Sequence, residues 1–89
     1  MVHRANTDFW SDYHSLPQDI RARADKQFVL LKSNPNHGSL QFKKIGIRVG
    51  KEIWSVRVTL KFRALAFKEV NEYVWFWIGE HAVYETLIH

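Results

Sequence analysis

The chain has 89 residues and no cysteine, and its thirteen Lys and Arg against nine Asp and Glu give a formal net charge of +4. This length fits one domain, residues 1–89, and a hydrophobic content of 46% is enough for a core without a covalent or metal staple. The lack of cysteine excludes disulfides, zinc–thiolate sites and thiol nucleophiles, and the basic balance favours polyanionic partners.

No segment approaches the roughly 20 apolar residues of a membrane span. The start of the chain has a basic residue, Arg4, but no apolar run behind it of the kind an export signal needs. We therefore expect a cytoplasmic protein that is not exported and that contacts no membrane.

Two helical patterns come first, and a turn-forming cluster at 34–39 follows them. Thr7 is the expected cap of a short first helix, and Pro17 is expected at the first position of a second helix, where its missing N–H costs nothing. Apolar residues recur at helical spacing in both segments: Phe9, Tyr13 and Leu16 in the first, and Ile20, Ala24, Phe28 and Leu31 in the second. The two segments should form a helical hairpin.

Four strands rich in β-branched and aromatic residues are expected after the turn, at 39–45, 53–58, 62–67 and 73–78, with a final helix from about 81 to 88. Short connections favour antiparallel pairing of consecutive strands. The fold class is therefore α+β: an N-terminal helical hairpin packed on a four-stranded antiparallel sheet, with a short C-terminal helix. Because the strand at 73–78 is apolar on both faces, either the last helix or a partner protein should cover its second face.

A pair of arginines is expected to face each other across two neighbouring strands. A three-residue loop at 59–61 pairs Val56 with Ala64 and therefore places Arg57 opposite Arg63. Like charges at this separation are destabilising, so either each guanidinium finds a surface carboxylate or the two together grip an anion such as a phosphate. Four further cations could extend such a site along a nucleic acid backbone: Lys43, Lys44, Arg48 and Lys51.

A second group of candidate residues follows the aromatic strand. His81 and Tyr84 lie three positions apart and so share a helix face. An imidazole can transfer protons near neutral pH, and a tyrosine hydroxyl can orient a phosphate. No metalloprotease, dinucleotide, P-loop or nucleophile-elbow motif is present, so metal-free acid–base chemistry without a cofactor remains. RNA is a suitable substrate for such chemistry, because the 2′-hydroxyl of the RNA itself serves as the nucleophile.

In order and spacing, three segments resemble toxins of the RelE/ParE superfamily: Trp54–Val58, Phe62–Ala66 and Trp77–Tyr84. The resemblance covers nearly the whole chain. It implies a toxin of a type II toxin–antitoxin module that a cognate antitoxin silences. In the RelE branch it implies a ribosome-dependent endoribonuclease, an mRNA interferase that inhibits translation.

The resemblance also implies residue roles. Arg57 and Arg63 would hold the scissile phosphate, His81 would transfer protons, and Tyr84 would align the nucleotide. Lys43 and Lys44 would contact the RNA backbone, or one of them would assist catalysis.

Two departures from the family pattern stand out. The polar start of the chain at 1–6 predicts that the usual first edge strand is stunted or absent, and Glu52 is the only nearby carboxylate for the base that several relatives use. Two alternatives stay open: a ParE-like inhibitor of DNA gyrase, and a decayed toxin that only binds its antitoxin.

Overall fold

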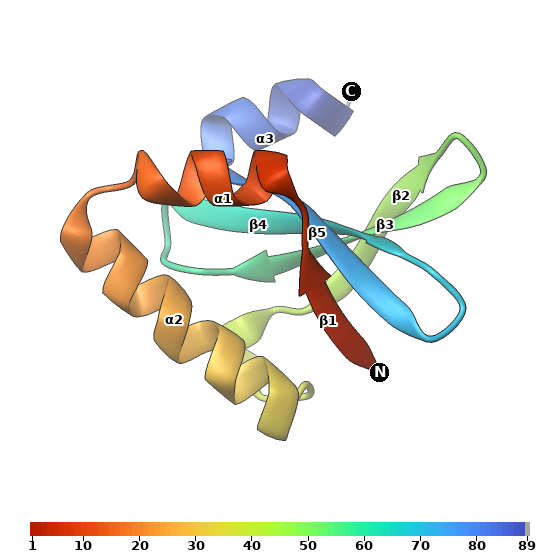
Figure 1. Cartoon of the computed structure of the whole chain (residues 1–89), viewed down its shortest axis with the longest axis horizontal. Coiled ribbons are helices and arrows are strands. Elements are labelled where there is room, and N and C mark those ends of the chain that lie inside the picture. Colours follow the sequence, from red (N-terminus) through yellow and green to blue (C-terminus); the bar gives the residue numbers. More distant parts are fainter. Residues whose placement is uncertain (89) are drawn as a thin grey trace.

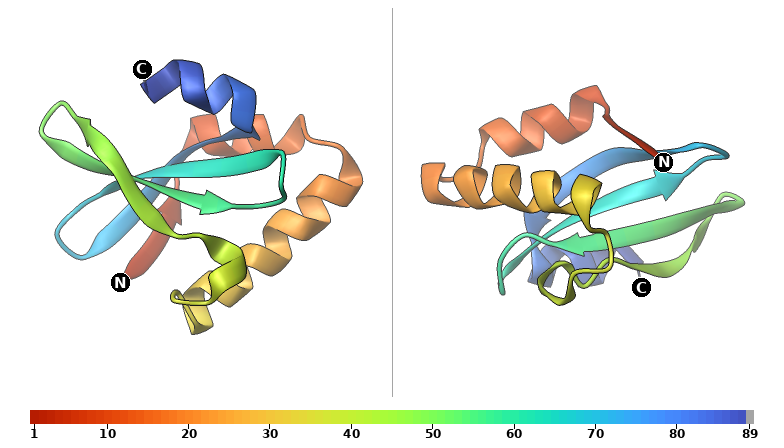
Figure 2. Two further views of the ribbon diagram at one scale, coloured as in Figure 1. Left: turned by 180° about the vertical axis from the view of Figure 1, so that it is seen from behind. Right: turned by 90° about the horizontal axis from the view of Figure 1, so that it is seen from below.

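The computed structural model describes the backbone of residues 1–88 and the side chains of residues 1–86, and it has two helices on one side of a sheet and one on the other (Figures 1 and 2). In chain order the elements are β1 (Val2–Ala5), α1 (Thr7–His14), α2 (Gln18–Ser33), a 3₁₀ turn η1 (Gly38–Leu40), β2 (Lys43–Arg48), β3 (Lys51–Arg57), β4 (Phe62–Lys68), β5 (Glu72–Glu80) and α3 (His81–Ile88). The α+β class and the final helix are confirmed.

The sheet has five strands in the order β1-β5-β4-β3-β2, not the four expected from the sequence. Strands β2 to β5 form the predicted antiparallel meander, whereas β1 pairs in parallel with β5, from Val2 opposite Glu72 to Ala5 opposite Trp75. The four residues of β1 give no clear apolar alternation. Of the two predicted possibilities, a stunted or an absent first strand, the structure has the first: β1 is present but only four residues long.

Side-chain contacts with β5 reinforce the backbone pairing of β1. The indole Nε1 of buried Trp75 donates a hydrogen bond to Nδ1 of His3 at 3.0 Å, and the His3 ring stacks on Tyr73 with centroids 5.3 Å apart. Arg4 pairs with Glu72 at 2.9 Å. A polar segment thus joins the sheet through one aromatic stack, one neutral hydrogen bond and one exposed ion pair.

Helices α1 and α2 cover one face of the sheet, which we call the helix face (Figure 2, right). The cap of α1 is Asn6, whose side chain accepts a hydrogen bond from the Phe9 amide at 2.9 Å, and not Thr7 as predicted. Pro17 occupies the cap position of α2, one residue before its expected place. The main core lies between these helices and the sheet, and its buried residues include Phe9, Ala24, Leu31, Val56, Val58, Ala64, Ala66 and Trp75.

The segment predicted as a strand at 39–45 is instead a 3₁₀ turn followed by a short extended segment, and β2 begins only at Lys43. The side chain of His37 accepts a hydrogen bond from the Ser39 amide and so starts the turn. Leu40 is completely buried, and Gln41 adopts a left-handed conformation with φ of 46°. Burial of Leu40 therefore overrides the β-propensity of this segment.

The opposite face of the sheet carries Ile53, Leu65, Arg57 and Arg63, and we call it the arginine face. Tyr84 of α3 packs on Ile53 and Leu65 in a second, smaller core. The last helix therefore covers part of this face, as one of the two predicted possibilities stated. Within the described residues, no helix is long and apolar enough to cross a membrane.

The contact between His3 and Trp75 should make stability depend on pH. Burial, then the charges of Lys32 and the N-terminal amine, lower the pKa of His3, so the folded state favours the neutral imidazole. As the pH falls through the unfolded value near 6.5, the unfolded chain binds more protons and stability decreases. We expect the urea midpoint to fall on acidification and the His3→Gln variant, which keeps an acceptor, to show a weaker fall.

The matched control is His14→Gln, which changes an exposed histidine of α1. It should keep the wild-type pH dependence. Equal pH slopes for wild type and His3→Gln would contradict the role given to His3.

Candidate functional site

The turn between β3 and β4 places two arginines face to face. The predicted register is confirmed: Val56 pairs with Ala64, and Arg57 pairs directly with Arg63. The turn closes with a hydrogen bond from the Val58 amide to the Phe62 carbonyl at 3.0 Å. Two cationic side chains therefore leave neighbouring strands on the same side of the sheet, at the end next to the turn.

Arg63 is held at this end by backbone carbonyls. Its Nη1 donates to the oxygens of Thr59 at 2.6 Å, Leu60 at 3.1 Å and Phe62 at 3.0 Å. Burial and the charge of Arg57 lower the pKa of Arg63, while Tyr84 acts in the opposite direction. A guanidinium stays protonated at working pH even so, and the three bonds position it as a fixed cation.

Arg57 has an unsatisfied donor. Its Nε is buried and has no hydrogen-bond partner in the described part of the chain, although such a group normally costs about 1–3 kcal/mol when left unpaired. Its backbone is fixed, because the buried side chain of Gln27 donates to the Arg57 carbonyl at 3.0 Å. A rigid backbone, a lone donor and a second guanidinium opposite together favour an anionic ligand.

Helix α3 brings its residues to the same end of the sheet. Gly79 pairs with Arg63 across β4 and β5, and the His81 amide donates to the Lys61 carbonyl at 2.7 Å. The rings of His81 and Tyr84 stack with centroids 5.1 Å apart and planes at 23°. The Tyr84 side chain is buried and is close enough to Arg63 to act on its pKa. The structure thus gathers Arg57, Arg63, Tyr84 and His81.

A β-bulge in β5 determines which aromatic side chains lie on the same face of the sheet as the two arginines. The register shifts so that Ala66 pairs with Trp75 but Leu65 pairs with Trp77, leaving Phe76 as the extra residue. Trp75 therefore lies in the core of the helix face, whereas Trp77 lies on the arginine face. Regular alternation would place both tryptophans on one side. Sequence reasoning could not assign Trp77 to this face, because the bulge has no sequence signal that we identified.

Glu85 is a second residue that the sequence reading missed. Its carboxylate lies 3.5 Å from Nε2 of His81, one helical turn away. The spacing of four residues was the available signal. A carboxylate beside one ring nitrogen can orient the imidazole.

The four additional cations lie in different places. Strand pairing puts Lys43 opposite Ser55 and Arg48 opposite Lys51, so that Lys43 and Arg48 share the arginine face. Lys44 pairs with Trp54 and lies on the helix face. Lys51 is the first residue of β3 and forms a 2.6 Å ion pair with Glu69.

Glu52 does not join the arginines. Glu52 lies two residues before Trp54 in β3, so both side chains point to the same face of the sheet. Its carboxylate accepts a hydrogen bond from the Trp54 indole at 2.9 Å. That bond, followed by the charges of Lys44 and Lys68, lowers the pKa of Glu52. This carboxylate therefore belongs to the helix face and is separated from Arg57 by the sheet.

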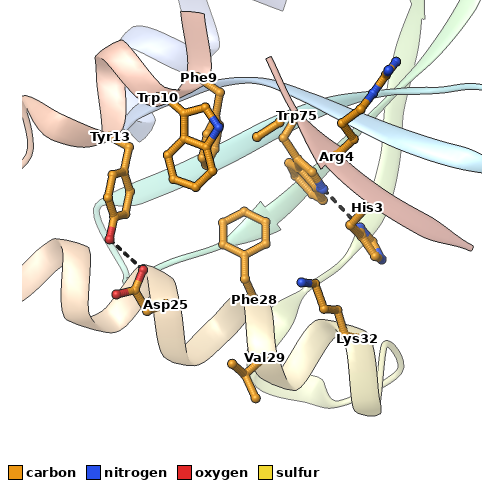
Figure 3. A pocket seen from close by; sticks show the side chains of 11 residues that line it. His3, Arg4, Phe9, Trp10, Tyr13, Asp25, Phe28, Val29, Lys32 and Trp75 are labelled. Atoms are coloured by element: carbon orange, nitrogen blue, oxygen red, sulfur yellow. Dashed lines mark hydrogen bonds between the residues drawn. The ribbon is translucent and has the colours of Figure 1, made fainter. Parts of the chain in front are cut away.

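A cavity of about 320 Å³ opens on the helical side of the molecule, between β1, α1 and α2 (Figure 3). Its walls are mainly aromatic, with Phe9, Phe28 and Trp75 in the interior, and the exposed Trp10 and Val29 also line it. Tyr13 donates to Asp25 at 2.7 Å beside it. No candidate catalytic residue reaches this cavity. Nowhere in residues 1–88 do three or more potential metal-ligating side chains come together.

Comparison with known proteins identifies the fold. No family model matches the chain, and no curated protein is significantly similar to it. Solved structures do match. YafQ from Escherichia coli superimposes with a TM-score of 0.72 at 12% identity, covering 92% of this chain and 94% of that one.

Two toxin–antitoxin complexes match as well. The RelB–RelE complex of Methanococcus jannaschii gives 0.71 at 13% identity, with 97% and 99% covered. The RelBE2 complex of Mycobacterium tuberculosis gives 0.64 at 23% identity, with 90% and 96% covered. This chain therefore has the fold of the RelE/ParE superfamily toxins.

The packing of Trp77 against Gly79 can be tested directly. A Cβ added at Gly79 would lie 2.6 Å from Cζ2 of the Trp77 indole, whereas one added at Gly46 of β2 would meet nothing within 4 Å. We expect Gly79→Ala to lower the free energy of unfolding by about 1–3 kcal/mol, as overpacking does. Gly46→Ala is the control and should be neutral or slightly stabilising in urea denaturation. Equal effects of the two substitutions would contradict this packing.

Proposed function

We propose that the chain is the toxin of a type II toxin–antitoxin module and that it cleaves mRNA on the ribosome, without a metal ion, and so inhibits translation. The observation that carries this proposal is the direct opposition of Arg57 and Arg63, with the Nε of Arg57 buried and unsatisfied. A phosphodiester between them would neutralise the repulsion between the two positive charges and accept a hydrogen bond from Nε of Arg57. The ribosome as the place of cleavage rests on the family resemblance.

The reaction is an internal transfer at phosphorus. The 2′-oxygen of the RNA attacks the adjacent phosphorus, the new O2′–P bond forms and the P–O5′ bond breaks. The 2′-hydroxyl loses its proton and the leaving 5′-oxygen gains one, so the products are a 2′,3′-cyclic phosphate and a 5′-hydroxyl. Negative charge grows on the nonbridging oxygens in the transition state, where Arg57 and Arg63 would stabilise it.

His81 is the proposed proton-transfer residue. Its ring lies against Tyr84, which approaches Arg63, and its Nε2 faces the Glu85 carboxylate. Glu85 would orient the ring, Tyr84 would align the nucleotide beside Arg63, and Lys43 and Arg48 on the same face would hold the flanking backbone. These roles need only side chains that the arginine face already presents.

An antitoxin partner is part of the proposal. Two of the structures with this fold are toxin–antitoxin complexes by their names. The aromatic cavity of Figure 3 lies on the opposite side from the arginines, and the exposed Trp10 and Val29 extend it to the surface. Contiguous exposed apolar groups of this kind suit a protein partner.

The arginine pair is tested by Arg57→Lys and Arg63→Lys, which keep the charge and remove the planar fork. We expect each to lower the rate of mRNA cleavage in a cell-free translation reaction roughly 100-fold, as loss of a transition-state donor does. Primer extension would measure the cut ends. Arg23→Lys, on the exposed side of α2, should cleave at the wild-type rate.

Loss of folding can be separated from loss of the site. Because Arg57 Nε has no partner, Arg57→Met should be at least as stable as wild type in urea denaturation and yet inactive. Full toxicity in both arginine variants would contradict the proposal. Intact translation together with blocked DNA supercoiling would instead indicate the gyrase inhibitor, and no toxicity in the wild type would indicate a decayed toxin.

His81 and Glu85 make a second, separate test. His81→Gln should lower the single-turnover cleavage rate about 100-fold or more, the range typical of a lost acid or base. Glu85→Gln should reduce the rate less, because the amide oxygen can still accept a hydrogen bond from Nε2 of His81 and so orient the ring. If Glu85→Ala, which removes the acceptor altogether, cleaves at the wild-type rate, this carboxylate does not position His81.

A further inference from the structure

A hollow of about 390 Å³ lies on the arginine face beside the proposed phosphate grip. Its apolar floor is formed by Ile53, Leu65 and Trp77, together with Phe76. Its polar rim comes from α1, through Asp8, Ser11 and Asp12, and from Arg48 of β2. An apolar floor with a few hydrogen-bonding groups at its margin is the usual composition of a small-ligand site, and the indole of Trp77 in this floor suits a planar heterocycle.

The strand register places this hollow next to the arginine pair. Leu65 pairs with Trp77, and two residues further along the same strands Arg63 pairs with Gly79. Two residues of a strand span about 7 Å, so the two rows are neighbours on one face. A ribonucleotide with its phosphate at Arg63 would therefore bring its own base, or the adjacent one, over Trp77.

Trp77 is built as a stacking surface. Its indole lies against the Gly79 backbone, where any Cβ would collide with the ring, and the side chain is only partly buried. The six-membered ring of the indole is thus held against the strand, and part of the side chain remains accessible. Exposed aromatic rings beside a cationic track bind unpaired bases by stacking, in single-stranded RNA above all.

The rim decides which base edge would fit. Asp8 and Asp12 are one helical turn apart and both line the hollow. Burial raises the pKa of Asp12, the Ile78 backbone opposes this, and the charge of Asp8 adds to it. Such carboxylates accept hydrogen bonds and repel phosphate, so they suit a base edge with two adjacent donors. Guanine offers this edge, since its ring N1–H and exocyclic amine point the same way and suit a carboxylate.

We propose that this hollow is a guanine-binding subsite in which Trp77 stacks on the base and Asp8, with Asp12, accepts from its Watson–Crick edge. The subsite rests on the proposed function, because it takes the base of a nucleotide that flanks the scissile phosphate. It makes Trp77 and Asp8 determinants of sequence specificity, separate from the arginines and His81 that act on the phosphate.

The first test uses purified protein and mononucleotides, and so needs no cleavage. Guanosine 3′-monophosphate should shift the indole N–H resonance of Trp77 in NMR titrations. Adenosine and inosine monophosphates should bind roughly tenfold more weakly, because adenine lacks the N1–H donor and inosine lacks the amine. The Trp10 resonance, on the helix side, should not move. No response of Trp77 to any of the three nucleotides overturns the proposal, and so does an equal response to all three.

The second test reads the cut sites. Mapping of transcript ends after induction should show guanine enriched at one fixed position beside the cut for wild type. Asp8→Asn, which exchanges an acceptor for a group that also donates, should lose this enrichment and keep cleaving. Trp77→Leu should cleave roughly tenfold less at every site. Val70→Ala, at an exposed residue of the turn between β4 and β5, should match wild type.

The two proposals fail in different ways. If cleavage depends on Arg57 and Arg63 but the base preference is the same in wild type and Asp8→Asn, the guanine subsite is wrong and the nuclease stands. If guanosine monophosphate shifts Trp77 but no transcript is cut, the nuclease is wrong and the subsite stands as a nucleotide site.

Discussion

Arg57 and Arg63 pair directly across β3 and β4, and this juxtaposition of two like charges is the constraint on which the arginine face depends. Such a pair destabilises the folded chain. The backbone carbonyls of the turn hold Arg63, but nothing in the described structure satisfies the buried Nε of Arg57. The folded state therefore carries one unpaired donor at Arg57, and an anionic ligand would be stabilised by pairing with it.

The sheet separates two kinds of surface. The helix face holds the main core and, at its margin, the aromatic cavity of Figure 3. The arginine face holds a smaller core beneath Tyr84 and leaves much of its area to charged and partly buried side chains. One face therefore supplies most of the apolar burial that stabilises the domain, and the other can tolerate unpaired charge.

The bulge in β5 changes which of the two faces the side chains of this strand point to. Before it, Tyr73 and Trp75 point into the helix-face core, and after it Ile78 does so as well. The register shift at Phe76 directs Trp77 and Gly79 to the arginine face, where the six-membered ring of the indole lies against the glycine. A single extra residue thus places an aromatic surface next to the arginine pair without removing Trp75 from the core.

Several features followed from the sequence because they depend on local rules. Helical spacing predicted α1 and α2, and β-branched and aromatic composition predicted β3, β4 and β5. The odd loop length predicted the register of Arg57 and Arg63. The three-residue spacing of His81 and Tyr84 predicted that they share a helix face, and in the structure their rings stack. In each case the periodicity of one element, or the length of one turn, determines which side chains meet.

Tertiary contacts decided the rest. The four residues of β1 form a strand because β5 and the Trp75 indole bind them, and burial of Leu40 turns a segment with strand composition into a 3₁₀ turn. The faces of Lys44 and Glu52, the place of Trp77 and the approach of α1 to the hollow depend on bulges and on long-range packing. Such contacts join residues distant in the chain, so no local pattern could reveal them.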